Sequence, residues 1–137
     1  MLTILEKVDV LQNAEIFRDV RTQSLARVAG IAQETGFKAR QRLFSENEAA
    51  DSLYVLLEGE VTLTRAGGEE RRRTRFQVAG ALALLEDRPQ TETATATQAV
   101  RALHIRQQDL FDVMAEDFSI TRGILRALAA LAADSDY

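Results

Sequence analysis

Apolar residues recur at two different periods along this chain, and the changes of period divide it into three parts. The first part shows helical spacing. Residues 2–17 carry apolar side chains about one helical turn apart, and a second apolar stripe follows at positions i, i+3, i+4 and i+7, formed by Leu25, Val28, Ala29 and Ala32. The sequence therefore predicts N-terminal helices over about residues 2–35.

Three residues mark where these helices are expected to begin and end. Asn13 has the short polar side chain that helix N-caps prefer, and it is expected to start a short second piece from Ala14 to Phe17. Thr22 is the expected N-cap of the following helix. Gly36 is its expected end, because glycine commonly follows the last helical turn.

In the second part, from about residue 36 to 105, the period falls to two. Short alternating stretches bounded by turn residues predict strands at 37–40, 42–44, 52–57, 61–65, 69–76, 91–97 and 100–105. The segment Ala66-Gly67-Gly68 is typical of a hairpin connection. This run of short strands flanked by helices indicates an α+β protein that is mainly β, built as a barrel or sandwich.

Helical spacing returns in the third part, over about residues 106–134. A helix is expected from about Gln107 to Glu116, and a last one from Ile120 onward, with an apolar stripe of Ile120, Ile124, Leu128 and Leu131. This stripe is too short to establish a coiled coil, so it predicts either a homodimer seam or a helix that covers the barrel.

The stretch from Gly80 to Ala99 is the most informative segment of the chain. Its start, from Gly80 to Leu85, predicts a tight turn that opens a short helix, and Pro89 lies just beyond that helix. The strictly alternating residues 91–97 predict a returning strand. A turn, one helical turn and a strand can direct several backbone N–H groups at one point, so the geometry predicts a small phosphate pocket.

Composition excludes several classes of function. The 137 residues include no cysteine and one histidine, so sites built from thiolates or clustered histidines are excluded, and we expect no metal and no cofactor. His104 has no evident nucleophile or acid partner in the sequence, and no catalytic residue is predicted. The net charge of −4 argues against a nucleic-acid surface. With no apolar run long enough to span a membrane, we expect a soluble, cytoplasmic domain.

These residues resemble the cyclic nucleotide-binding domain family, and the resemblance covers nearly the whole chain. Residues 43–63 are similar to the family's entry strands, notably the Asp51-x-x-Tyr54 pair and Gly59 before Val61. Residues 80–94 resemble its phosphate-binding cassette. The resemblance implies a single domain over residues 1–137: an eight-stranded jelly roll over about 36–105 with helices before and after it.

The cassette departs from the family pattern at the positions that grip the ligand. By resemblance, a glutamate that holds the ribose is replaced by Ala81, and an arginine that pairs with the cyclic phosphate is replaced by Gln90. A position that is normally small holds Glu92. An amide cannot replace the charge of an arginine, so we expect the domain not to bind cyclic AMP or cyclic GMP in the usual way. The candidate ligand-binding residues of this degenerate cassette are Gly80, Ala81, Leu82, Ala83, Gln90 and Thr91.

The sequence therefore favours a non-catalytic regulatory or interaction module, attached to a larger protein or partner. The opening LEKVDVLQNAEIF resembles the N-terminal segment of copies fused to larger chains. The alternative is a sensor that binds a cyclic nucleotide or related small molecule in an altered pocket, where Gln90 and Thr91 bond a neutral ligand or Arg73 or Arg75 replaces the missing arginine. DNA binding would need a winged helix after the last helix, which these residues do not supply.

Overall fold

The structure is a computed structural model that describes residues 1–134. Its strands are β1 (Gln33–Phe37), β2 (Arg42–Phe44), β3 (Ser52–Glu58), β4 (Val61–Thr64), β5 (Glu70–Arg73), β6 (Val78–Ala79), β7 (Thr93–Ala96) and β8 (Val100–Arg106). Its helices are α1 (Ile4–Gln12), the 3₁₀ helix η1 (Glu15–Phe17), α2 (Thr22–Ile31), α3 (Ala81–Glu86), α4 (Gln107–Glu116) and α5 (Phe118–Asp134).

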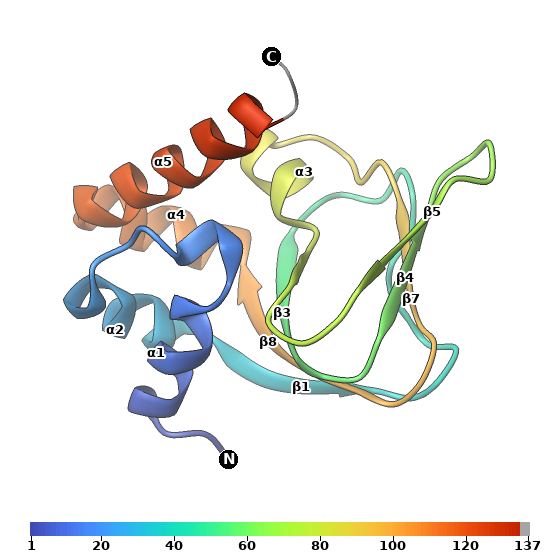
Figure 1. The fold of residues 1–137 in the computed structure, drawn as a ribbon, viewed down its shortest axis with the longest axis horizontal. Helices are drawn as coiled ribbons and strands as arrows, with labels where there is room; N and C mark the ends of the chain where they lie inside the picture. The colour runs from blue at the N-terminus through green and yellow to red at the C-terminus, as the bar shows by residue number, and fades with distance from the viewer. Residues whose placement is uncertain (135–137) are drawn as a thin grey trace.

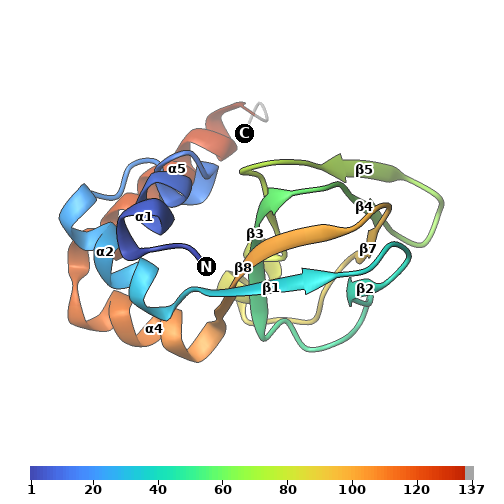
Figure 2. The same cartoon turned by 90° about the horizontal axis from the view of Figure 1, so that it is seen from below.

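The strands form two antiparallel four-stranded sheets. Sheet A has the order β1-β8-β3-β6, and sheet B has the order β2-β7-β4-β5. Helices from both ends of the chain gather on one side of sheet A, while sheet B lies on the other (Figure 1). Figure 2 shows β5 at the outer edge of sheet B. The predicted mainly β, α+β jelly roll with flanking helices is confirmed.

The alternation of side chains along β3 builds two separate cores. Leu53 and Val55 point towards the helices and join a large cluster with Leu103 and Ile105 of β8. Leu56 points the other way, into a smaller cluster that fills the space between the two sheets. Because successive strand residues face opposite sides, one apolar strand serves both cores.

Of the caps of the first two helical segments, the one predicted at Asn13 is wrong. The cap of α1 is Thr3, whose Oγ1 accepts from the Glu6 N–H at 3.1 Å, while the Glu6 carboxylate accepts from the Thr3 N–H at 2.9 Å. Asn13 ends α1 instead of starting η1, and its side chain donates to the Asp9 carbonyl at 2.8 Å. Ala14 takes the N-cap position of η1 without a side-chain bond.

The second predicted helix is also shorter than expected. Thr22 is its first residue and Arg21 takes the cap position, because the Thr22 hydroxyl accepts from the Gln12 side chain at 2.7 Å instead of capping. The helix ends at Ile31. Gly36, which was expected to end it, lies inside β1 opposite Arg101 of β8. Strand pairing therefore outweighs the helical apolar pattern beyond residue 31.

Candidate functional site

Gly80 sets the geometry at the start of α3. Its φ of 89° lies in the left-handed region that favours glycine. A Cβ at this position would lie 3.1 Å from the Ser52 carbonyl oxygen and 3.3 Å from Nε2 of Gln90, so the backbone approaches both closely. The helix ends at Glu86, and its C-cap Asp87, also left-handed, donates its N–H back to the last turn. The predicted turn and short helix are present, and Pro89 lies two residues beyond the Asp87 cap.

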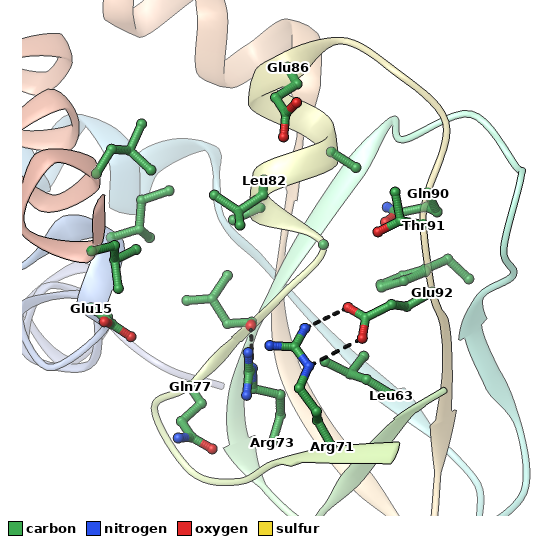
Figure 3. Close-up of a pocket in the computed structure, with 18 of the residues that line it drawn as sticks. Glu15, Leu63, Arg71, Arg73, Gln77, Leu82, Glu86, Gln90, Thr91 and Glu92 are labelled. Carbon is green, nitrogen blue, oxygen red and sulfur yellow. Dashed lines mark hydrogen bonds and ion pairs between the residues drawn. The ribbon is translucent and has the colours of Figure 1, made fainter. Parts of the chain in front are cut away.

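A cavity of about 680 Å³ opens beside this turn (Figure 3). All six residues predicted from the cassette line it, namely Gly80, Ala81, Leu82, Ala83, Gln90 and Thr91. Its apolar side is completed by Ile16 of η1 and by Leu128 and Leu131 of α5. The last helix therefore forms part of the cavity wall. The apolar stripe of this helix predicted either a homodimer seam or a cover for the barrel, and this contact corresponds to the second role.

Gln90 is the buried polar residue of this wall, with only 4% of its surface exposed. Its backbone is fixed on both sides, since its N–H donates to the Glu48 carbonyl and its carbonyl accepts from the Asn47 N–H, both at 2.8 Å. Its carboxamide lies at the cavity wall, with Nε2 beside Gly80 (Figure 3). An amide at a cavity wall has both a donor and an acceptor group to offer to a ligand or water.

Glu92 is held by two arginines on the same wall. Arg71 grips its carboxylate with both ends of the guanidinium fork, with Nη2 to Oε1 at 2.6 Å and Nε to Oε2 at 3.2 Å (Figure 3). Nη2 of Arg65 lies 3.7 Å from Oε2. The Glu92 side chain is 13% exposed, whereas the two arginine side chains are 43% and 44% exposed. The inward glutamate is therefore neutralised within the protein.

The arginine-rich strand divides its side chains between two faces, as alternation requires. Arg71 and Arg73 line the cavity, while Arg72 lies 3.7 Å from Glu60 and does not line it. Nε of Arg73 donates to the Val78 carbonyl at 3.2 Å, and partial burial, followed by the neighbouring Arg71, lowers the pKa of its guanidinium. Arg75 stacks over the Phe76 ring at 4.6 Å and is not part of the lining. Of the two predicted substitutes for the missing arginine, only Arg73 reaches the cavity.

His104 lies away from the cavity, in sheet A. Its Nε2 and the Ser52 hydroxyl are 2.6 Å apart, and its ring stacks on Tyr54 with centroids 5.0 Å apart. Burial, and secondly the charge of Arg106, lower the pKa of His104, while Asp51 opposes them. Within residues 1–134 no group of three His, Asp or Glu side chains is placed to hold a metal.

Sequence reasoning missed part of the wall. Arg65 is not predicted as a site residue. Arg71 enters the sequence prediction only within the basic run 71–73, which could bind an anion or an acidic partner but for which a solvated strand face is favoured, although the alternation of β5 places Arg71 on the same face as Arg73. Finding their contact with Glu92 needed the register of three strands, in which Leu63 lies opposite both Arg71 and Ala94. A single sequence does not supply that register.

Comparison with known proteins identifies the fold and the family. The family model described as "Cyclic nucleotide-binding domain" matches residues 34–117. The chain therefore belongs to the cyclic nucleotide-binding domain family and is a non-catalytic regulatory domain of that type.

Its relatives include transcriptional regulators. The chain is 29% identical over 126 residues to a CRP-like cAMP-activated global transcriptional regulator of Mycobacterium tuberculosis, covering 88% of this chain and 56% of that protein. The chain thus spans little more than half the length of this relative. It also resembles the N-terminal domain of a transcriptional regulator from Streptomyces coelicolor, with a TM-score of 0.79, 27% identity and coverage of 93% and 94% of the two chains.

A third similarity concerns the fold alone. A putative cyclic nucleotide-binding protein from Geobacter metallireducens superposes over all of both chains with a TM-score of 0.80 and 23% identity. Separately, none of the helices within residues 1–134 combines the length and apolar character needed to cross a membrane.

Proposed function

We propose that this domain regulates a longer protein without binding cyclic AMP or cyclic GMP in the manner usual for its family. The observation that carries the proposal is the charge arrangement of the cavity wall. The cassette position expected to meet the phosphate holds the neutral amide of Gln90, and the carboxylate of Glu92 on the same wall already engages Arg71 and Arg65. A cyclic phosphate entering here meets no unpaired cassette arginine.

Magnitudes support the same conclusion. Leaving a buried charge without its partner typically costs about 2–5 kcal/mol, and leaving a ribose hydroxyl unpaired beside Ala81 adds about 1–3 kcal/mol. Since each ~1.4 kcal/mol changes an affinity tenfold, even partial additivity turns a micromolar ligand into a millimolar one.

The experiment restores the residues with which the family holds the ribose and the phosphate. The triple variant Ala81→Glu, Gln90→Arg, Glu92→Ala returns the two ligand-gripping residues and the small side chain. We expect cyclic AMP to raise the melting temperature of this variant and to bind to it at least tenfold more tightly than to the wild type. The reason is that both ligand-holding side chains are restored in a cavity whose shape is otherwise unchanged. Differential scanning fluorimetry and calorimetry measure these effects.

The matched control is Gln98→Arg, which changes an exposed glutamine of the β7–β8 connection and adds the same charge as Gln90→Arg. It should leave cyclic AMP binding as weak as in the wild type. Equal affinities of the wild type and the triple variant would contradict the proposal.

A second candidate function is favoured by the carboxamide of Gln90. Buried and placed beside an apolar wall, it suits a neutral ligand that offers adjacent hydrogen-bond donor and acceptor groups, such as a purine edge. The domain would then be a sensor with an altered ligand. In a calorimetric screen of cyclic mononucleotides, cyclic dinucleotides, adenosine and guanosine, this candidate predicts saturable nucleoside binding that Gln90→Ala abolishes and Gln98→Ala preserves. No saturation by either nucleoside would favour the first candidate.

The α5 helix is the proposed route of any signal. Leu128 and Leu131 touch the cavity, while Leu125 of the same helix is 56% exposed, so one helix meets both the cavity and the outside. We propose that α4 and α5 move when the cavity fills, and that α5 contacts a fused domain, a protein partner or a second copy in the cytoplasm. No nucleic-acid or membrane partner is proposed for this segment itself. Cross-linking from a cysteine introduced at Leu125 tests the homodimer.

A further inference from the structure

The two arginines that hold Glu92 converge on a single oxygen atom. Nε of Arg71 lies 3.2 Å from Oε2, and Nη2 of Arg65 lies 3.7 Å from the same atom. The two arginines come from different parts of sheet B. Arg71 belongs to β5, and Arg65 directly follows β4. Two guanidinium groups that meet at one acceptor define a position suited to an anion.

The register of sheet B shows how the contact forms. Leu63 of β4 pairs with Arg71 on one side and with Ala94 of β7 on the other. The Arg71 side chain therefore passes over β4 to reach Glu92, which directly precedes β7. This ion pair lies across the cavity face of the sheet, as Figure 3 shows.

The acid is also the least exposed member of the group. Its side chain is 13% exposed, against 43% for Arg71 and 44% for Arg65. A carboxylate at this depth supplies the negative charge that the two guanidinium groups attract. An anion entering the cavity would have to displace it and would meet its charge.

We infer that Glu92 is a specificity-determining residue, an internal carboxylate that occupies an anion site formed by Arg71 and Arg65 and so excludes anionic ligands. The inference rests on the proposed function in treating the cavity as the ligand space, and it adds the reason why anions are rejected there. It concerns arginines outside the cassette, so it does not depend on the charge at Gln90. Removing the carboxylate converts the wall into a site for a phosphate-sized anion.

The test uses inorganic phosphate as the probe, in a low-salt buffer free of sulfate. Phosphate binding to the wild type, Glu92→Ala and Glu92→Gln is measured by calorimetry and by the shift of melting temperature. We expect both variants to bind phosphate at least tenfold more tightly than the wild type. Glu92→Gln keeps the shape of the side chain and guards against misfolding of the alanine variant.

Two further variants test whether the gain in phosphate affinity depends on this site. Adding Arg71→Ala to Glu92→Ala should return phosphate binding to the wild-type level. Asp9→Ala, which removes one exposed acid from α1 outside the cavity, should behave like the wild type despite its equal change in net charge. The inference is overturned if neither Glu92 variant gains affinity, if the gain survives the loss of Arg71, or if Asp9→Ala gains as much.

These outcomes are separate from those of the proposed function. Phosphate has neither base nor ribose. If the Glu92 variants gain no affinity for phosphate, Glu92 does not explain the weak binding of cyclic AMP that we propose for the wild type. The proposed function itself is not contradicted by that result. Tight cyclic AMP binding by the wild type would instead defeat the proposed function, whatever the phosphate result.

Discussion

The core face of sheet A and the cavity end of sheet B belong to one jelly roll but differ in chemistry. Leu53, Leu103 and Ile105 of sheet A are fully buried against the helices. The cavity end of sheet B instead presents Arg65 and Arg71, each more than two-fifths exposed and joined to Glu92. A tightly packed core tolerates little change in side-chain volume. An ion pair that is partly in contact with water can be replaced with only a small loss of stability. Changes are thus expected to cost more stability in the core of sheet A than at the cavity end of sheet B, where recognition can change.

The largest expected effect is in sheet A. Leu103→Ala should lower the free energy of unfolding by about 2–5 kcal/mol, because it removes a fully buried side chain and leaves a cavity. Urea unfolding measures this loss. Leu5→Ala, at a position 80% exposed on α1, is the control and should change stability by about 0.5 kcal/mol or less. Similar losses for the two variants would remove the distinction between core and surface.

Next in size is a pair of helical glycines. A Cβ at Gly123 of α5 would lie 2.9 Å from both the Asp19 carbonyl oxygen and Cα of Val20, so Gly123→Ala should destabilise by about 1–3 kcal/mol. Gly30 of α2 has no atom within 4 Å of its Cβ position, so Gly30→Ala should stabilise by about 0.5–1 kcal/mol. Thermal unfolding of both variants should give shifts of opposite sign. Two shifts of the same sign would refute the close approach of α5 to the Asp19–Val20 backbone.

A smaller effect is expected in sheet B. Glu92→Gln should lower the free energy of unfolding by about 1 kcal/mol or less, because its arginine partners remain in contact with water. Urea unfolding alongside Leu103→Ala makes the comparison direct. A loss for Glu92→Gln as large as that for Leu103→Ala would show that the ion pair is structural.

The smallest effect is a pH dependence from His104. Burial lowers its pKa below the ordinary value of 6.5, so as the pH falls from about 7 to 5 the unfolded chain binds more protons than the folded one. The free energy of unfolding should therefore decrease over that range, and less so in His104→Gln. NMR titration of the imidazole should give a midpoint below 6.5. A midpoint at or above that value would contradict this account.

The fold was predictable where a segment carried its own pattern. The helix expected from Gln107 to Glu116 has those bounds, and the apolar strand at residues 52–57 is β3 with one more residue. The helix caps were not predictable, because the two side chains make other hydrogen bonds. The Thr22 hydroxyl accepts from the Gln12 side chain, and the Asn13 side chain donates to the Asp9 carbonyl.

The candidate site divides in the same way. Gly80 and Gln90 lie within one cassette, so their proximity followed from local sequence. The partners of Glu92 lie about twenty residues or more away in sequence, and the strand register alone brings them together. Whether the six cassette residues bind a ligand stays a prediction.

One measurement tests the central claim most directly: calorimetric titration of the wild-type domain with cyclic AMP at low salt, beside Gln90→Ala. An uncharged amide in the phosphate position and a carboxylate already held by the nearby arginines predict no saturation below about millimolar ligand for either protein. Micromolar, saturable binding by the wild type that Gln90→Ala abolishes would contradict the account.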